Sequence, residues 1–379
     1  MIIYKKAILP SGFLANGVCA GIKKSGKSDL ALFYSALPAK AAVQFTQNKI
    51  QAAPLKINKR HLKESRDFRA IAVNSGNANC FTGQSGSADA VKMAQYVAAG
   101  LKIAPKKILI ASTGIIGKRL PVGKIKNAIP ELIRGLSAKN VDKAKLAILT
   151  TDKFTKGITA KINIAGKTVT ICGIAKGSGM IAPNMATMLA FIFTDADIAQ
   201  AALNKALKTA TGQSFNCISV DNCMSTNDTV IVMANGASRN APVDTHGSFN
   251  LFSRALNLVC LELAKMIVRD AEGATKFIRI RVDKAGNFKQ AKQIALAIAN
   301  SALFKIAVYA ESPNFFGRAV AAAGASRADI KEKDIKVKAT SLKRRDIDIN
   351  VSVNTGKSSA TVYTCDLTHG YIKINAEYN

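Results

Sequence analysis

The chain contains a turn-forming segment that leads straight into an apolar run, KGSGMIAPNMATMLAFIFTD at residues 176–195. Its glycines and proline predict a turn, and residues 189–193 predict a buried strand. If the bond between Ala186 and Thr187 is cut, Thr187 becomes a chain terminus at the start of this strand. Its α-amine can then accept the proton of its own hydroxyl, so that one residue supplies both nucleophile and base. Taken alone, however, the pattern favours an ordinary turn before a strand.

The composition is that of a folded protein with more than one packed part. The chain has 379 residues, of which 48% are hydrophobic and 21% are charged, so it is long for a single core and is not disordered. Its longest uncharged apolar run, residues 185–193, is far shorter than a membrane span. The N-terminal residues lack the charged-then-apolar layout of a signal peptide. We therefore expect a cytoplasmic protein with no membrane partner.

The net charge of +30 raises the question of a nucleic-acid partner. The lysines are dispersed singly or in pairs, and the longest basic run covers only residues 343–345. Aromatic residues make up 6% of the chain and tryptophan is absent, so platforms for stacking bases are scarce. The sequence carries no recognisable nucleic-acid-binding module. The charge therefore indicates a lysine-rich, solvated surface rather than a nucleic-acid interface.

Cysteine and histidine usage argues against a metal site. The seven cysteines form no CxxC pair and lie mostly in apolar stretches, which is typical of buried, reduced thiols. The three histidines are scattered, without the spacing of metal ligands or of a histidine-based triad. We expect neither a bound metal nor a resident cofactor.

Strands and helices alternate along the chain, which predicts a mixed α/β fold. The predicted strands cover residues 70–73, 108–111, 162–164, 169–171, 189–193, 229–233, 277–282, 347–353 and 362–365. The predicted helices cover residues 87–101, 198–207 and 252–269. Ser87 is placed to cap the first helix. Turn residues at 165–166 and at 354–356 predict that the strands on either side of them form hairpins.

Two polar loops that follow predicted strands are candidates for a catalytic site. Residues 112–117 are mostly small, which lets backbone N–H groups point at a ligand as an oxyanion hole requires. Residues 74–79 form a similar loop that is rich in side-chain amides. Glu272 follows a predicted helix, where the helix dipole disfavours an acidic residue, so it is a candidate for binding a substrate ammonium. An ordinary strand-to-helix turn and a solvated turn carboxylate remain the alternatives.

Several stretches together resemble one family. The segment at residues 176–189 closely resembles the self-cleaving segment of the ornithine acetyltransferases, the glutamate N-acetyltransferases of arginine biosynthesis. Further matching stretches follow in family order over almost the whole chain, at residues 73–79, 111–114, 150–152, 225–228, 270–276 and 375–378. By this resemblance the chain is identified as a member of that family.

The resemblance assigns roles to individual residues. It implies that Thr187 is the nucleophile, freed by autocatalytic cleavage after Ala186, and that Thr113 and Gly114 form the oxyanion hole. It also implies substrate contacts, which are expected at Thr150, Lys176, Thr187, Glu272 and Asn375.

The resemblance further implies a fold and an assembly. Members of this family are heterotetramers of two α and two β pieces, which here are residues 1–186 and 187–379. The implied fold is a mixed α/β sandwich of the N-terminal-nucleophile type, with sheets layered against helices.

Three features depart from the family pattern. The family usually runs two residues past the Asn-Ala-Glu-Tyr motif at 375–378 and ends in a hydroxyl residue that contacts substrate, whereas this sequence stops at Asn379. Residues 221–224, Asp-Asn-Cys-Met, stand where Asp-Gly-Asp-Thr is usual, so the geometry of that loop is open. The net charge of +30 is atypical as well.

The implied activity is transfer of an acetyl group from N-acetylornithine to glutamate through an acetyl-threonine ester, in a ping-pong cycle. Lys176 is the candidate for binding the α-carboxylate that both substrates share, and Glu272 is the candidate for binding the ornithine ammonium. Acetyl-CoA stays open as a second acetyl donor. The alternatives are an N-terminal-nucleophile amidase or aminopeptidase, in which water replaces glutamate, and a basic nucleic-acid-binding protein.

Overall fold

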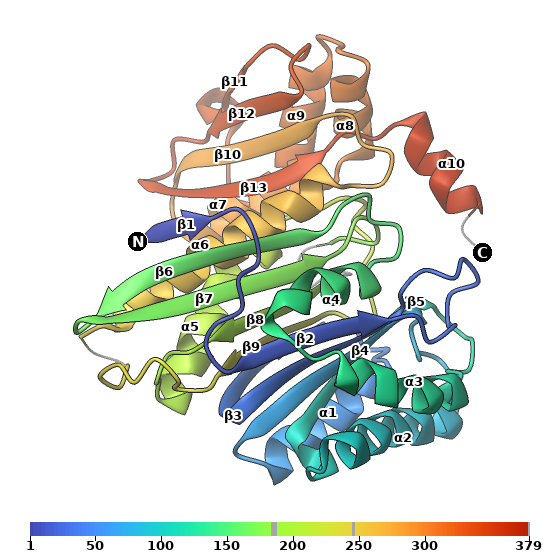
Figure 1. Cartoon of the computed structure of the whole chain (residues 1–379). Coiled ribbons are helices and arrows are strands. Elements are labelled where there is room, and N and C mark those ends of the chain that lie inside the picture. The colour runs from blue at the N-terminus through green and yellow to red at the C-terminus, as the bar shows by residue number, and fades with distance from the viewer. Residues whose placement is uncertain (183–187, 245–246, 378–379) are drawn as a thin grey trace. The chain divides into compact units, whose positions relative to one another are not determined.

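A computed structural model describes residues 1–182, 188–244 and 247–377 (Figure 1). The described residues divide into two compact units. The first unit holds residues 1–177, 188–213, 225–244 and 247–263. The second unit holds residues 178–182, 214–224 and 264–377. Both units combine helices and strands, so the predicted mixed α/β fold is confirmed.

The described part of the first unit contains one hydrogen-bonded sheet of nine strands. The strands are β1 (Ile2–Tyr4), β2 (Phe13–Val18), β3 (Leu30–Phe45), β4 (Phe68–Asn77), β5 (Ile108–Ile115), β6 (Lys156–Ile164), β7 (Lys167–Lys176), β8 (Leu189–Thr194) and β9 (Thr229–Ala234). Their order is β1-β6-β7-β8-β9-β3-β4-β5, and β2 pairs with β3. Parallel pairing occurs between β4 and β5 and between β8 and β9.

The long strand β3 belongs to two layers of this sheet. Residues 30–34 pair with β4, whereas residues 40–45 pair with β9. The register shifts between Tyr34 and Ala39, a stretch that includes Pro38, which has no N–H to donate to a ladder. The sheet therefore folds over at this point, with β2, β4 and β5 in one layer and β6 to β9 in the other.

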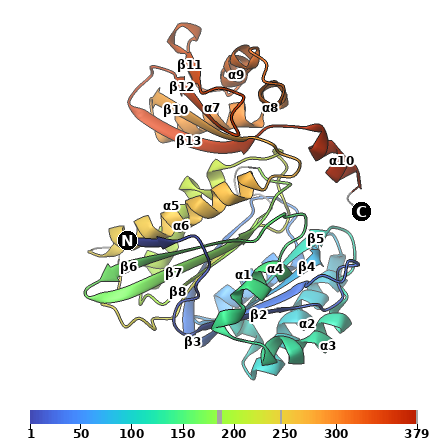
Figure 2. The same cartoon turned by 45° about the horizontal axis from the view of Figure 1, so that its top comes forward.

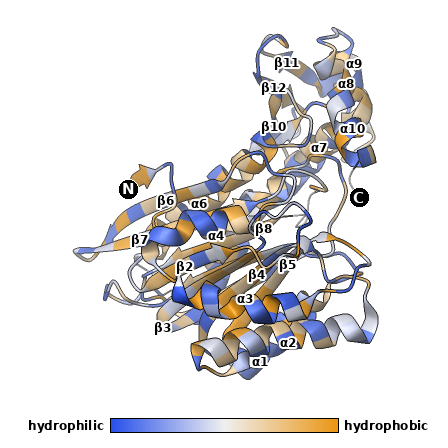
Figure 3. Cartoon of the chain, turned by 45° about the vertical axis from the view of Figure 1, so that its right-hand side comes forward, coloured by the Kyte–Doolittle hydropathy of each residue, from blue (hydrophilic) through white to orange (hydrophobic). Residues whose placement is uncertain are grey.

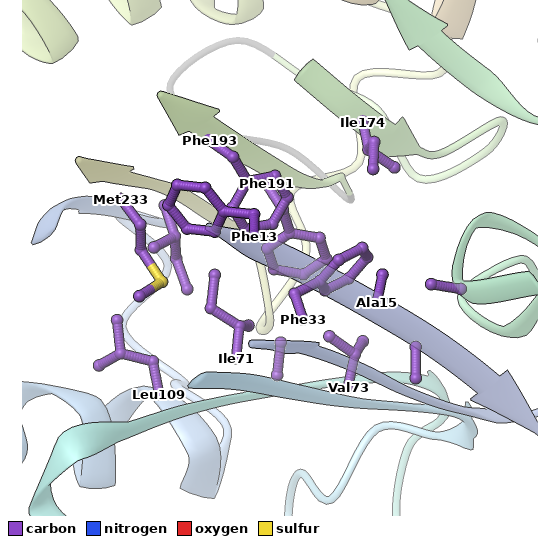
Figure 4. Packing of buried hydrophobic residues seen from close by; sticks show 14 of the residues in the cluster. Phe13, Ala15, Phe33, Ile71, Val73, Leu109, Ile174, Phe191, Phe193 and Met233 are labelled. Carbon is purple, nitrogen blue, oxygen red and sulfur yellow. The ribbon is translucent and has the colours of Figure 1, made fainter. Parts of the chain in front are cut away.

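Apolar side chains fill the space between the two layers (Figure 4). The ring of Phe193 in β8 lies 5.2 Å from that of Phe13 and 5.0 Å from that of Phe33, measured between centroids. Phe33 also contacts Phe191, at 5.5 Å. Because side chains alternate between the two faces of a strand, Phe191 and Phe193 both point into this core. The run after the predicted cleavage bond is thus a central strand of the sandwich.

Helices cover the outer face of each layer (Figures 2 and 3). The layer of β4 and β5 is covered by α1 (Ala53–Glu64), α2 (Gly83–Leu101) and α3 (Val122–Arg134). Along α1 and α3 both apolar and polar residues occur, as expected of helices that bury one face (Figure 3). The other layer carries α5 (Gln200–Gln213) and the first part of α6 (Phe249–Arg269), where Gly173 of β7 lies against Val259 and Leu263. Helix α4 (Val141–Ala147) contributes to the core between the layers. The first unit is a sandwich of helices, sheet, sheet and helices.

The second unit has its own core, built on a four-stranded sheet. Its strands, in the order β11-β12-β10-β13, are β10 (Phe277–Ala285), β11 (Lys336–Ala339), β12 (Asp346–Ser352) and β13 (Ser358–Cys365). Its helices are α7 (Phe288–Asn300), α8 (Ala302–Tyr309), α9 (Phe315–Gly324) and α10 (His369–Glu377). The first three pack their apolar residues on one face of the sheet. Short 3₁₀ turns complete the described structure of the two units, at η1 (Pro105–Lys107), η2 (Ala138–Asn140), η3 (Phe215–Cys217) and η4 (Glu332–Asp334).

The local predictions hold for most elements and fail at two. The hairpin of β6 and β7 is confirmed, and its turn residues Ala165 and Gly166 have φ of 49° and 80°. The helix expected to start at Ser87 begins at Gly83, and its N-cap is Thr82, so the predicted Ser87 cap is wrong. The hairpin expected around residues 354–356 is also wrong, because β10 lies between β12 and β13.

The cysteines are partly as predicted. Cys19 and Cys223 are exposed, whereas the other five are buried, so the expectation of burial is wrong for these two. No group of three or more His, Cys, Asp and Glu side chains within the described residues is placed to hold a metal ion. Within the same residues no single helix is long and apolar enough to cross a membrane. Only α7 and α8 together reach that length and apolarity, and the pair is bent by 62°.

The compact units do not follow the predicted cleavage bond. Strand β8 lies on its C-terminal side, yet β8 pairs with β7 from its N-terminal side, with Leu189 opposite Lys176. Strand β9 likewise pairs with β3. The predicted pieces 1–186 and 187–379 therefore share one sheet, and the division into pieces stays a prediction.

Candidate active site

Three of the predicted site residues converge in the first unit. Thr113 lies near the end of β5, Lys176 ends β7, and Thr150 lies in the loop between α4 and β6. The Lys176 Nζ donates hydrogen bonds to Thr150 Oγ1 at 2.7 Å and to Thr113 Oγ1 at 3.3 Å. Lys176 is 2% exposed. The lysine predicted to bind a carboxylate thus links a predicted substrate contact to the predicted oxyanion loop.

Gly114 occupies a position that only glycine can fill. Its φ is +131°, and a side chain there would collide with the backbone of Gly76 in the neighbouring strand β4. Asn227 connects the loops at residues 74–79 and 112–117, because its Nδ2 donates to the carbonyl oxygens of Ala78 at 2.7 Å and Ser112 at 2.8 Å. The backbone around Thr113 and Gly114 is therefore held before any ligand arrives.

A buried carboxylate that the sequence analysis did not single out organises the lysines. Asp152 accepts a hydrogen bond from Lys156 Nζ at 2.7 Å, lies 3.8 Å from Lys176 Nζ, and accepts from the Gly177 amide at 2.6 Å. Burial alone would raise the pKa of Asp152, but the charges of Lys176 and Lys156 hold it well below its usual range. We call Thr113, Thr150, Asp152, Lys156 and Lys176 the Lys176 cluster.

A further lysine contributes to the positive potential near this cluster. Burial lowers the pKa of Lys23 to about 8, and the positive charge of Lys176 adds to this shift while Asp29 opposes it. Lys23 packs against Gly76, beside the Gly114 turn. Asp29 accepts hydrogen bonds from backbone amides, including that of Lys23 at 2.9 Å. Because lysines outnumber carboxylates here, the region favours an anionic ligand.

The other two predicted contacts, Glu272 and Asn375, come together in the second unit. Asn375 Nδ2 of α10 donates to Glu272 Oε2 at 3.0 Å. The Glu272 amide donates to the carbonyl oxygen of Ser178 at 3.0 Å. A side chain at Gly179 would collide with the Glu272 carboxylate, so the glycine allows the close approach. We call Glu272 and Asn375 the Glu272 pair.

The loop at residues 221–224, which departs from the family pattern, has a defined conformation. Asn222 has a φ of +59°, a conformation that asparagine tolerates better than most residues, so it suits the place of the usual glycine. Asp221 accepts hydrogen bonds from the amides of Met180 at 2.6 Å and Ile181 at 2.8 Å. Burial raises the pKa of Asp221, and its hydrogen bonds oppose that rise. The loop therefore holds the upstream part of the predicted cleavage segment.

The remaining predicted site residues lie outside the described part of the chain. These are Ala186 and Thr187, and Asn379 at the C-terminus is outside it too. The nearest described residue after Thr187 is Met188, whose amide donates to Asp228 Oδ1 at 2.8 Å.

Asp152, Asn227 and Asp228 have no predicted role. All three belong to stretches quoted for the resemblance, residues 150–152 and 225–228, so a signal was present. Asp228 directly precedes β9, and Asp152 lies two residues after the predicted contact Thr150. What the sequence alone does not give is the partner of each side chain.

Comparison with known proteins gives consistent matches. The sequence matches a family model described as the ArgJ family over residues 14–343 and 337–379. It is 45% identical to the arginine biosynthesis bifunctional protein ArgJ of Oceanobacillus iheyensis, with 97% of this chain and 95% of that protein covered. It is 43% identical to the protein of the same name from Caldanaerobacter subterraneus subsp. tengcongensis, with 100% and 99% covered. Among solved structures it is similar to the ornithine acetyltransferase of Mycobacterium tuberculosis complexed with ornithine. That likeness has a TM-score of 0.44 and 35% identity and covers 48% of this chain and 97% of that chain.

Proposed function

The chain belongs to the ArgJ family, and we propose that it is a glutamate N-acetyltransferase of arginine biosynthesis, which moves the acetyl group of N-acetylornithine to glutamate. The two sequence relatives named above support this activity, because each is named an arginine biosynthesis bifunctional protein and this chain matches each over nearly its whole length.

The observation that carries the proposal is the Lys176 cluster. Both substrates have an α-carboxylate, and a buried lysine with a hydroxyl on either side suits this group. Lys176 holds the Thr150 and Thr113 hydroxyls within 2.7 and 3.3 Å of its Nζ. Asp152 keeps the lysine oriented through their 3.8 Å ion pair. The cluster thus recognises the group that donor and acceptor have in common.

The first chemical step is self-cleavage. The Thr187 hydroxyl attacks the Ala186 carbonyl carbon, the C–N bond breaks, and the hydroxyl proton ends on the released nitrogen. The resulting ester between Ala186 and Thr187 is then hydrolysed by water, which leaves a carboxylate on Ala186 and restores the hydroxyl of Thr187. Fixed proximity of hydroxyl and carbonyl favours this attack.

The acetyl transfer uses the same hydroxyl. The freed α-amine, whose reference pKa is about 7.7–8.0, takes the hydroxyl proton as the oxygen attacks the acetyl carbonyl of N-acetylornithine. Thr113 and Gly114 stabilise the oxyanion. Ornithine leaves with the proton on its α-amine, and the glutamate α-amine then attacks the acetyl-threonine ester. N-acetylglutamate leaves and the hydroxyl is restored.

The Glu272 pair serves the side-chain end of the substrate. The Glu272 carboxylate attracts the side-chain ammonium of ornithine, and Asn375 orients that carboxylate through a 3.0 Å hydrogen bond. Glutamate brings a carboxylate to the comparable position, where Asn375 can donate a hydrogen bond instead. For that reason we expect the part of the site that binds the substrate side chain to accept both an ammonium and a carboxylate.

Acetyl-CoA is a further candidate donor, since the relatives are named bifunctional. The same proposal includes cytoplasmic action and a heterotetramer of two 1–186 and two 187–379 pieces. Strand β7 of the first piece pairs with β8 of the second, which supports an assembly that stays together after cleavage.

The rival activity is that of an N-terminal-nucleophile amidase or aminopeptidase, and one assay separates the two. Purified protein is incubated with N-acetylornithine carrying a labelled acetyl group, with and without glutamate. Our proposal predicts that the label passes to N-acetylglutamate and that little free acetate forms. Label appearing only as acetate, at a rate that glutamate does not change, would establish the hydrolase instead. Replacing N-acetylornithine by labelled acetyl-CoA then tests the second donor.

A further inference from the structure

Tyr371 of α10 carries a phenol hydroxyl close to the Glu272 pair. Among the described residues this hydroxyl makes one hydrogen bond, which it donates to Asp221 Oδ2 at 3.2 Å. An O–H···O bond is usually about 2.7–2.8 Å long, so this bond is weak. The Tyr371 side chain is half-buried rather than enclosed. The hydroxyl can therefore exchange its partner for a ligand at little cost.

The fold does not depend on this hydroxyl. Helix α10 is held at its start, because Thr368 Oγ1 donates to the carbonyl oxygen of Gly273 at 2.7 Å and the backbone of Tyr371 lies against Gly273. Asp221 is held as well, since three backbone amides donate to its carboxylate. The bond between the hydroxyl and Asp221 is thus an addition to two anchors that already exist, which leaves the hydroxyl free for a role in binding.

The hydroxyl and the Glu272 carboxylate are held at adjacent points of one backbone segment. The Glu272 carboxylate packs against Gly179. The next residue, Met180, donates its amide at 2.6 Å to the same Asp221 oxygen that the hydroxyl binds. Consecutive Cα atoms are about 3.8 Å apart. The two groups are therefore close enough to act on one end of a small ligand.

Helix α10 places Tyr371 on the face that meets Glu272. Tyr371 and Asn375 are four residues apart and so share one face of the helix. Asn375 Nδ2 donates to Glu272 Oε2 and to the carbonyl oxygen of Tyr371, both at 3.0 Å. Burial and the negative charges of Asp221 and Glu272 raise the pKa of Tyr371. The hydroxyl accordingly keeps its proton and can donate it in a hydrogen bond.

We infer that Tyr371 is a specificity-determining residue whose hydroxyl binds the substrate side chain in both half-reactions. This inference rests on the proposed function. A phenol hydroxyl has one proton to donate and lone pairs that accept. With N-acetylornithine, the oxygen accepts from the side-chain ammonium while its proton stays on Asp221. With glutamate, the hydroxyl turns about its C–O bond and donates to the side-chain carboxylate.

The neighbouring groups cannot change their role so easily. Glu272 as a carboxylate only accepts. Asn375 has two N–H bonds on its Nδ2 and uses both, toward Glu272 and Tyr371. When the hydroxyl turns away, Asp221 Oδ2 keeps the Met180 amide at 2.6 Å, so no buried oxygen loses its last donor. The switch needs no transfer of a proton and breaks only the weak 3.2 Å bond.

The test compares Tyr371→Phe with Tyr309→Phe. The first change removes the hydroxyl and keeps the ring. The ring of Tyr309 packs on that of His369 in the same helix, at 6.0 Å between centroids, so the second change reports the loss of a tyrosine hydroxyl beside α10. N-acetylornithine is the donor, and glutamate or norvaline is the acceptor. Norvaline has the carbon chain of glutamate with a methyl group in place of the side-chain carboxylate.

In a ping-pong cycle kcat/KM for each substrate reports its own half-reaction. We expect Tyr371→Phe to lower kcat/KM by about 10- to 100-fold for glutamate and for N-acetylornithine, the effect of losing a hydrogen bond to a charged group. The value for norvaline should change little, and Tyr309→Phe should leave all three values close to those of the wild type. A fall for only one of the two charged substrates overturns the inference. An equal fall for norvaline also overturns it, because the hydroxyl would then have only a structural role.

A variant with 3-fluorotyrosine in place of Tyr371 keeps the hydroxyl and serves if Tyr371→Phe does not fold. The fluorine makes the phenol more acidic, so its hydroxyl becomes a better donor and a poorer acceptor. We expect kcat/KM for glutamate to rise relative to that for N-acetylornithine, and an unchanged ratio contradicts the inference. If the wild type transfers no acetyl group to glutamate, the proposed function fails. If it does, only the role of Tyr371 is in question.

Discussion

The Lys176 cluster and the Glu272 pair hold their charges in different ways. In the cluster, the side chains of Asp152 and Lys156 are fully buried and that of Lys176 is 3% exposed. In the pair, Glu272 is partnered by Asn375, which lies on an exposed helix face. Glu272 itself is 8% exposed, so the two regions differ in their partners rather than in the burial of the carboxylate. The cluster balances a buried carboxylate with buried lysines, whereas the pair gives Glu272 an uncharged amide partner on an exposed helix.

The largest effect is expected from Lys176→Met, which removes the common contact. We expect kcat/KM to fall by about 10²- to 10³-fold for both substrates, because a buried charge partner is lost. The measurement is steady-state kinetics with N-acetylornithine and glutamate varied in turn. If kcat/KM fell for only one of the two substrates, the cluster would not bind the α-carboxylate that both of them share.

Asp152→Asn is expected to cost stability as well as activity. Removing one partner of a buried ion pair costs about 3–5 kcal/mol of unfolding free energy, and here it leaves Lys156 and Lys176 without their carboxylate. The pKa of Asp152 is held below its usual range, so its contribution is full above its unfolded pKa of about 3.9 and is lost as the pH falls further. Urea unfolding of wild type and variant at pH 7 and at pH 3 measures the difference in their free energy of unfolding. If this difference were the same at both pH values, the ionised Asp152 carboxylate would not be the source of the stability.

Glu272→Gln is expected to act on one substrate. It removes the charge that attracts the ornithine ammonium, so KM for N-acetylornithine rises by about tenfold while that for glutamate changes less than about threefold. Asp346→Asn is the matched control, because Asp346 is an exposed carboxylate of the same unit that pairs with Arg269 at 2.7 Å. Equal changes for the two substrates would show that Glu272 does not distinguish them.

The smallest effect is expected from Gly179→Ala. The added methyl group would collide with the Glu272 carboxylate and displace it, so we expect KM for N-acetylornithine to rise by about two- to fivefold. Gly317→Ala is the control, because a side chain there meets nothing within 4 Å. An unchanged KM in Gly179→Ala would indicate that the position of this carboxylate is not critical.

Sequence reasoning succeeded where the determinants are local. The β6–β7 hairpin follows from alternation and from the turn at Ala165 and Gly166, and helix α6 follows from its apolar spacing. It failed at β12 and β13, because β10 enters between them through pairing with residues some 70 positions away. It also placed the start of α2 four residues late, since a polar residue that suits a cap need not be the cap.

The candidate site shows the same limit. The motifs led to Lys176, Thr150 and Glu272, and the structure supplies their partners. Asp152 could not be ranked above other acidic residues, because its importance lies in burial between two lysines. Asn222 could not be judged from its departure alone, because its left-handed backbone appears only in the fold.

The central claim is that acetyl transfer runs through Thr187, and mass spectrometry tests it most directly. Purified wild type and Thr187→Ala are incubated with N-acetylornithine without glutamate, and the masses of their pieces are measured. We predict that the wild type gives two pieces whose masses add up to the 40.1 kDa chain plus one water, and that the piece beginning with Thr187 gains one acetyl group, which glutamate removes. Thr187→Ala should remain one unacetylated chain. A wild type that transfers acetyl groups while uncut, or that carries the acetyl group on another residue, would contradict the account.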